Sequence, residues 1–211
     1  MALETGRKRL FVSPSEIEPM VSAATVIGDC RRELAARSRT IVSEVLGDTP
    51  PSEWRHYPDG EVYDPKSHAQ YFYHSHPLSD LRTREHGHFH TFLRADGMPA
   101  GAAPLILPEI AVAEVPALPP QAPPLKHGIR EEVSHLVAIA VDARGEPIRL
   151  FTTNRWVTGE TWYLADDVIG MLDRFAITVA EPSETRTDGS AQFFGCSVLK
   201  SRRYCRRATR Q

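Results

Sequence analysis

Histidines occupy alternate positions in one short stretch of the chain, at His86, His88 and His90. The residues between and after them include phenylalanine and threonine, which favour extended backbone. In a β-strand successive side chains point to opposite faces, so alternate residues share a face. The pattern therefore predicts a strand from His86 to Leu93 with three imidazoles on one side. A helix would instead spread the same side chains around its axis.

A second pair, His74 and His76, ends an aromatic-rich run that begins at Ala69. This run has the composition of a strand, and the polar segment 77–85 connects it to the next one. Two strands joined in this way pair antiparallel, and they bring both sets of histidines together if their faces match. Residues 54–94 are thus predicted to form a histidine-rich β region.

The other elements follow from apolar spacing and turn residues. Apolar residues at helical spacing predict a helix over residues 20–46, and Gly47 would end it. Residues 133–175 are predicted to form a β-hairpin, with its turn at 142–146, and a helix near 164–175. The chain is therefore predicted to be a single α+β domain over residues 1–180, with an N-terminal helix, an antiparallel sheet built from two hairpin regions and the later helix.

Two segments do not fit a regular element. Proline is dense between residues 97 and 128, which excludes one continuous helix or strand there. A loop lying along the surface and a lid over the histidine face are the alternatives. Residues 181–211 are predicted to be a poorly ordered tail, whose end is rich in lysine and arginine. Such a tail can bind phosphate, or it can simply be a solvated terminus.

The histidine cluster predicts a metal site, because neutral imidazole is a common ligand of iron, zinc and copper. The cofactor expected is a divalent transition metal, Fe, Zn or Cu, and the sequence does not identify which; with five histidines, a site with two metals is an alternative. The proposed ligands are His74, His76, His86, His88 and His90. Residues proposed as an extra ligand, or as partners that orient a ligand, are His68, Asp80, Glu85 and His135. The alternatives without metal are acid–base catalysis by one or two histidines and a hydrogen-bonded polar surface.

A loop over residues 154–162 concentrates polar and aromatic side chains. Within it, Arg155 is a candidate for binding a substrate carboxylate or phosphate, because a guanidinium can hold either group through two hydrogen bonds. The alternative is that Arg155 pairs with Glu160 and has a structural role.

The histidine spacing completes no known catalytic metal motif. The segment 74–77 is similar to the His-Ser-His-Pro centre of JAMM-type zinc isopeptidases, but Gly87 stands where that family has its aspartate. Cupins follow their His-x-His pair with a glutamate, whereas Arg94 and Ala95 occupy the corresponding region after His90. The metal prediction therefore depends on residue type and strand alternation alone.

Three segments carry a resemblance to a known family: EWRHYPDGEVYDPKSHAQYFYHSHP, EHGHFHTFLRADGMP and LFTTNRWVTGETWY. They resemble an uncharacterised family of bacterial proteins, a domain of unknown function. The likeness spans roughly residues 50–180. It implies no activity and no role for any residue.

Charge and cysteine usage set the remaining expectations. A net charge of -2 gives no overall attraction to nucleic acid or acidic lipid. No export signal, membrane-spanning stretch or disulfide framework is recognisable, so a cytoplasmic protein acting on a small molecule is expected. The function favoured is a metal-dependent enzyme, either a non-haem iron oxygenase or a metallohydrolase. The alternatives are a non-catalytic metal- or haem-binding sensor or accessory protein, and a nucleic-acid interaction module that uses the basic tail.

Overall fold

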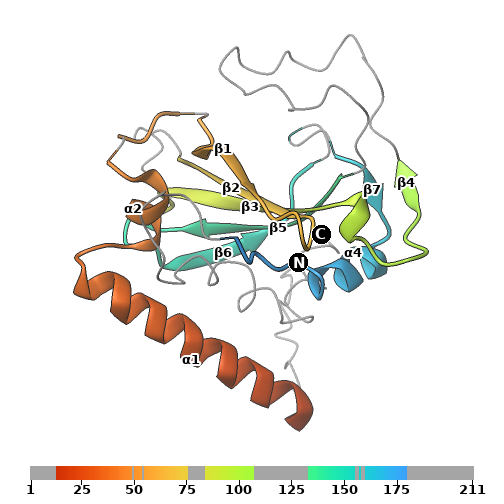
Figure 1. Cartoon of the computed structure of the whole chain (residues 1–211), viewed down its shortest axis with the longest axis horizontal. Coiled ribbons are helices and arrows are strands. Elements are labelled where there is room, and N and C mark those ends of the chain that lie inside the picture. Colours follow the sequence, from red (N-terminus) through yellow and green to blue (C-terminus); the bar gives the residue numbers. More distant parts are fainter. Residues whose placement is uncertain are drawn as a thin grey trace, which may run out of the picture.

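The computed structural model describes residues 13–48, 50–53, 55–75, 84–106, 133–154, 157 and 160–179. These residues form an α+β fold (Figure 1), which confirms the fold class predicted from the sequence. The helices are α1 (Pro14–Ala36), α2 (Ile41–Leu46) and α4 (Ala165–Leu172), with a 3-10 turn η1 (Ala95–Gly97). The strands are β1 (Tyr57–Tyr63), β2 (Ala69–Ser75), β3 (Gly87–Arg94), β4 (Pro104–Ile106), β5 (Val133–Val141), β6 (Pro147–Phe151) and β7 (Trp162–Tyr163).

Five strands form one sheet in the order β1-β2-β3-β5-β6, and each neighbouring pair is antiparallel. The β2–β3 and β5–β6 pairs correspond to the two hairpin regions expected from the sequence. Pairing of β3 with β5 joins them into one sheet. Strands β4 and β7 pair in a separate two-stranded sheet.

One face of the five-stranded sheet carries the hydrophobic core. The core residues of β2, β3 and β5 on this face are Tyr71, Tyr73, Phe89, Leu93, Val137, Ile139 and Val141. Helices α2 and α4 contribute Val42, Val45, Met171 and Leu172 to this core. Helix α4 lies beneath one end of the sheet, and α2 lies near the opposite end of the sheet (Figure 1). Because side chains alternate along a strand, the opposite face carries the residues between these positions.

Two helices replace the single helix predicted over residues 20–46. Helix α1 begins at Pro14 and continues through Pro19 to Ala36. Pro19 lies inside α1 and removes the hydrogen bond that its N–H would donate to the Ser15 carbonyl, but the helix continues past it. The break comes later: Ser38 has a φ of 54°, and Thr40 caps α2 by accepting a hydrogen bond from the Ser43 N–H.

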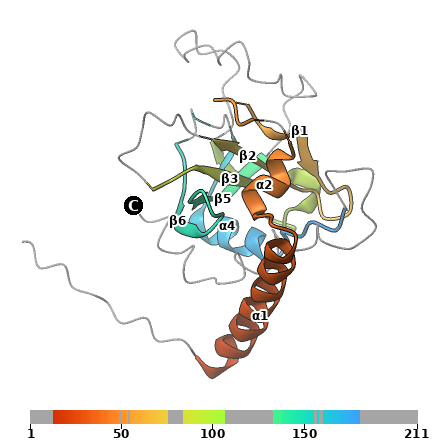
Figure 2. The same ribbon diagram turned by 90° about the vertical axis from the view of Figure 1, so that its left-hand side faces the viewer.

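Helix α1 points away from the sheet in both views (Figures 1 and 2). Its C-terminal end is attached to the body of the protein, since Leu34 is buried and Arg31 forms an ion pair with Glu146. Toward its N-terminal end Ile17, Met20 and Val21 are exposed. Among the described residues, the contacts that anchor α1 are therefore near its C-terminal end.

Pro58-Asp59-Gly60 has the composition of a turn, but it lies inside strand β1 as an irregularity. Gly60 and Glu61 have φ angles of 81° and 60°, and the register with β2 shifts between Tyr57 and Val62. A backbone with positive φ here bulges the strand instead of reversing it.

The turn between β5 and β6 has the position expected from the sequence. The Asp142 carboxylate accepts hydrogen bonds from the backbone N–H groups of Arg144 and Glu146 at 2.9 and 3.0 Å. Gly145 has a φ of 76°, which explains why glycine is suited to this position.

Asp64 joins the β1–β2 connection to the end of the described chain. One carboxylate oxygen accepts from the backbone N–H groups of Lys66 and Ser67 at 2.8 and 3.1 Å. The other accepts from the N–H of Thr178 and from its hydroxyl, the latter at 2.7 Å. Burial alone would raise the pKa of Asp64, but these hydrogen bonds outweigh it and lower the pKa to about 2.

Some of the predicted segments are only partly described. The proline-rich segment 97–128 includes β4, which pairs with β7, whereas residues 107–128 lie outside the described residues. The predicted tail 181–211 lies outside them entirely, and the single-domain boundary at residue 180 stays a prediction. In the part of the chain that is described, no helix has the length and apolar character needed to cross a membrane.

Candidate metal centre

Pairing between β2 and β3 brings the two sets of histidines together. In this register His74 lies opposite His88, and Phe72 lies opposite His90. These positions alternate with the core residues Tyr73 and Phe89, so they belong to the face of the sheet away from the core. Residues that the sequence separates by a connection thus become cross-strand neighbours.

Three imidazoles converge on this face. His74, His88 and His90 each offer a ring nitrogen, and the three nitrogens lie within 4.8 Å of one another. The ring centroids are 4.2 Å apart for His74 and His88, and 4.6 Å apart for His88 and His90. His88 and His90 are 6% and 1% exposed, whereas His74 is half-buried. We call this group the histidine triad; it has the composition and spacing of a metal site.

Glu85 orients one member of the triad. Its carboxylate lies 2.8 Å from Nδ1 of His88, and its other oxygen accepts a hydrogen bond from Nη2 of Arg149 at 2.7 Å. A carboxylate at Nδ1 favours the tautomer with the imidazole proton on that atom, so Nε2 of His88 is the atom that could bind a metal. Because the Glu85 side chain is only 5% exposed, this hydrogen bond is shielded from water.

His135 orients a second member. Its Nε2 lies 3.0 Å from Nδ1 of His90. Burial lowers the pKa of His135 to about 3, and burial together with the nearby His135 and His88 lowers the pKa of His90 well below its usual value. Both rings are therefore neutral at pH 7, which is the form of histidine that binds metals.

Aromatic rings surround the triad. The Phe72 ring lies 4.9 Å from the His90 ring, and the Phe151 ring lies 5.0 Å from the His88 ring. His56 stacks on Phe72 at 3.7 Å, and its Nδ1 lies 2.9 Å from the Glu61 carboxylate. This packing restricts rotation of the imidazoles and keeps the local surroundings apolar.

His86 departs from the alternation that predicted three imidazoles on one side. It precedes β3, and its Nδ1 lies 2.5 Å from the hydroxyl of Tyr73, whose ring belongs to the core face. Gly87 explains this, because a Cβ at that position would lie 2.4 Å from the Tyr73 hydroxyl. Without a side chain at Gly87, the Tyr73 ring reaches His86 and holds it apart from the triad.

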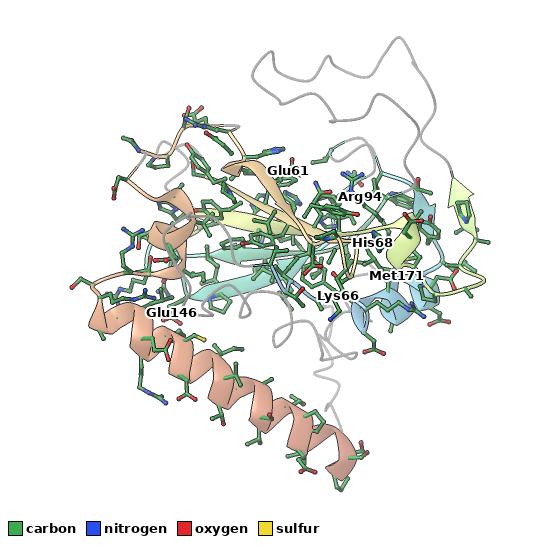
Figure 3. The ribbon with its side chains drawn as sticks, in the orientation of Figure 1. Glu61, Lys66, His68, Arg94, Glu146 and Met171 are labelled. Carbon is green, nitrogen blue, oxygen red and sulfur yellow. The ribbon has the colours of Figure 1, made fainter. Side chains whose placement is uncertain are left out.

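His68 and Glu85 have different positions relative to the triad. His68 lies on the β1–β2 connection beside Arg94 (Figure 3), and its Nδ1 bonds the Tyr63 hydroxyl at 2.8 Å. It is not among the residues that converge with the triad. Glu85, in contrast, contacts the triad directly through His88.

Three other predicted site residues lie outside the described residues: His76, Asp80 and Arg155. The structure adds Arg149, Phe151 and His56, which the sequence did not single out for the site. Arg149 and Phe151 could have been found from the β5–β6 hairpin, because alternate residues of β6 share a face. His56 carried no such signal, since it precedes β1.

We expect Gly87→Ala to destabilise the protein by about 1–3 kcal/mol. The added Cβ would lie 2.3 Å from the His74 carbonyl oxygen and 2.4 Å from the Tyr73 hydroxyl, so the two strands must shift. Chemical denaturation measures this effect. Gly101→Ala is a poor control because its φ is positive, whereas Gly28→Ala on α1 meets only the end of the Arg32 side chain and should not destabilise. Equal stability of Gly87→Ala and the wild type would contradict the close approach of Tyr73.

A family model with the description Domain of unknown function (DUF6969) matches residues 21–188. This match includes every described residue of the triad and its partners. It agrees with the resemblance to an uncharacterised family noted in the sequence. No curated protein and no solved structure matches the chain.

Proposed function

The chain belongs to the DUF6969 family, whose function is unknown, and from its site we propose that it is a metal-dependent enzyme acting on a small molecule. The histidine triad would bind one divalent transition metal. The observation that carries this proposal is the convergence of three ring nitrogens within 4.8 Å, two of them backed by buried partners. Isolated surface histidines have no need of such support.

The donor set favours a metallohydrolase over an oxygenase. Three neutral imidazole ligands do not offset the 2+ charge of a bound divalent ion. Three histidines together with an open coordination position are a known arrangement of catalytic zinc. Non-haem iron oxygenases commonly use two histidines and a carboxylate. Glu85, which contacts the triad, engages His88 and Arg149 with its oxygens and thus acts behind a ligand.

The position of the triad on a sheet supports a catalytic role. All three histidines project from one face, so they can occupy only one side of a bound ion. When bound, a divalent ion would supply Lewis acidity that lowers the pKa of a coordinated water. Glu85 and His135 hold two imidazoles in the orientation needed, while Phe72 and Phe151 limit the access of bulk water.

A non-catalytic metal-binding role is the second candidate. The observation in its favour is the burial of His88 and His90, which are 6% and 1% exposed. Buried ligands are typical of closed sites, which retain metal without reacting. The half-buried His74 distinguishes the two candidates, because a catalytic site needs access from at least one side.

Cobalt reconstitution tests the proposed function. Protein without a polyhistidine tag is loaded with Co²⁺, and both the metal content and the visible absorption are measured. We expect one equivalent of cobalt and a change in the absorption bands when azide is added, because an open position accepts the anion. Full loading without any azide effect would favour the non-catalytic role. Less than about a tenth of an equivalent would reject both roles.

Glu85→Gln should weaken Co²⁺ binding about tenfold to a hundredfold, as is usual when a partner of a ligating histidine is lost. Glutamine keeps the shape of the side chain but removes the charge that makes His88 a better donor. Competition with a coloured chelator measures the affinity. Glu61→Gln is the matched control, because Glu61 bonds His56 instead of a member of the triad. Unchanged affinity in Glu85→Gln would show that Glu85 does not support the metal site.

A further inference from the structure

We propose that Arg149 binds the anionic group of the substrate, and that this substrate is a small organic molecule carrying a carboxylate. This inference rests on the proposed metal-dependent function and extends it by naming the chemical class of the substrate. It is carried by the position of Arg149 beside the triad, its exposure, and the charge balance of the site.

Strand register places Arg149 in the same row as the triad. Arg149 on β6 pairs with Ala140 on β5, and Ala140 pairs with His88 on β3. Residues that face each other across a sheet share a face, so Arg149 and His88 project from the same side with only Ala140 between them. The methyl group of Ala140 does not separate the two larger side chains.

Two contacts fix the guanidinium in this place. Its Nη2 donates to Glu85, the carboxylate that also bonds His88, at 2.7 Å. Its central carbon lies 4.5 Å from the centroid of the Phe151 ring, which itself contacts His88. Arg149 is therefore held by the two side chains, Glu85 and Phe151, that also contact His88.

The guanidinium remains accessible despite these contacts. The Arg149 side chain is 58% exposed, whereas the Glu85 side chain beneath it is 5% exposed. A guanidinium carries five N–H donors, and the bond to Glu85 uses one nitrogen. The outer edge can thus form the paired hydrogen bonds that a carboxylate accepts.

Charge balance favours an anion at this edge. In the part of the chain that the structure describes, contacts place four charged side chains on this face: Glu61, Glu85, Arg94 and Arg149. The formal charges of these two carboxylates and two guanidinium groups cancel. A divalent ion would therefore leave the site with a net positive charge, which a carboxylate can offset.

The competing explanation is that Arg149 only neutralises the buried Glu85. A buried carboxylate does need such a partner. That role needs only the hydrogen bond from Arg149 to Glu85, and it makes no use of the N–H groups on the exposed edge of the guanidinium. The two explanations differ in what happens when a carboxylate is offered to the protein.

The test compares two single-charge variants of the cobalt protein, Arg149→Gln and Arg84→Gln. Arg84 adjoins Glu85 in the chain, but its side chain is 87% exposed and pairs at 3.9 Å with Asp142. Arg84→Gln therefore removes one positive charge, as Arg149→Gln does, at a residue that does not contact the triad. Calorimetric titrations use acetate, benzoate and succinate, with benzamide as the uncharged counterpart of benzoate. Cobalt content is measured for every sample.

We expect the wild type to bind at least one carboxylate about tenfold or more tightly than benzamide, Arg149→Gln to lose this preference, and Arg84→Gln to keep it. Arg149→Lys should keep only part of it, because an ammonium lacks the planar pair of donors. Equal carboxylate binding by Arg149→Gln and the wild type, an equal loss in Arg84→Gln, or no carboxylate binding at all would each overturn the inference. Failure of the proposed function itself appears separately, as a lack of cobalt in the wild type.

Discussion

Replacing His90 with alanine should abolish stoichiometric metal binding, with a rise in the dissociation constant of about a thousandfold, beyond the tenfold to hundredfold typical of supporting residues. The substitution removes one of the three converging nitrogens and leaves His135 without the ring that it contacts at 3.0 Å. Two imidazoles on a sheet cannot hold a divalent ion against solvent and chelators as three can. Competition with a chelator of known affinity measures the loss.

A second ligand variant separates metal binding from folding. His90 is 1% exposed, so His90→Ala also leaves a cavity beside Phe72 and reduces stability. His74 is half-buried, and His74→Ala should lose metal to a similar extent at a smaller cost in stability. His68→Asn is the control, because asparagine tolerates the positive φ of 60° at that position and His68 lies apart from the triad. Metal binding by His90→Ala or His74→Ala at wild-type affinity would contradict the assignment of ligands.

Replacing Asp64 with alanine should reduce the free energy of unfolding by about 3 kcal/mol, because buried donors are left without an acceptor. Asp64 is 0% exposed and accepts hydrogen bonds from Lys66, Ser67 and Thr178. The loss would detach the end of the described chain from the β1–β2 connection. Urea denaturation at pH 7 measures this effect. A change below about 0.5 kcal/mol, as for ordinary surface substitutions, would contradict the role of Asp64.

The contribution of Asp64 should also depend on pH. Its folded pKa of about 2 lies below the ordinary value of 3.8, so the folded protein binds the proton less readily than the unfolded chain does. The stabilisation is therefore fully present above pH 3.8 and is lost as the pH falls through about 2. Relative to Asp64→Asn, the wild type should lose about 1 kcal/mol of stability between pH 6 and pH 3. A constant difference between the two proteins over this range would show that the pKa of Asp64 is not lowered.

Residue type and strand alternation in the sequence identified the two strands that carry the site and the residues that form the triad. His88 and His90 share a face as predicted, and antiparallel pairing adds His74. The exception is His86, because β3 begins one residue after it and the Tyr73 hydroxyl reaches it across Gly87. Strand alternation holds only within the paired strand, and the end of that strand depends on packing that sequence spacing does not reveal.

The position of His135 depended on an irregularity in the sheet. Thr91 pairs with Val137, but the next residue, Phe92, pairs with His135, so the register shifts between them. A bulge of this kind reverses which residues share a face, and it places His135 beside His90. The sequence suggested that His135 could reach the site, but only the register shows how it does so.

The break between α1 and α2 was hidden for a similar reason. Apolar spacing continues across residues 36–41, so periodicity alone predicts one helix. The break is set by local hydrogen bonds: Thr40 and Ser43 cap each other reciprocally, and Arg39 donates to the Ser43 carbonyl at 2.9 Å. Thr40 was a recognisable capping residue, and giving it more weight than the spacing would have predicted two helices.

Anomalous scattering from crystals of the protein grown with Zn²⁺ would most directly test the convergence of the triad on a metal. We predict one strong peak at the zinc edge, with nitrogen ligands from His74, His88 and His90 at about 2.0–2.1 Å. Glu85 should lie behind His88, and neither Glu85 nor Arg149 should contact the ion directly. A peak bound by other histidines, such as His56 or His68, or the absence of any peak on this face of the sheet would contradict the proposed metal centre.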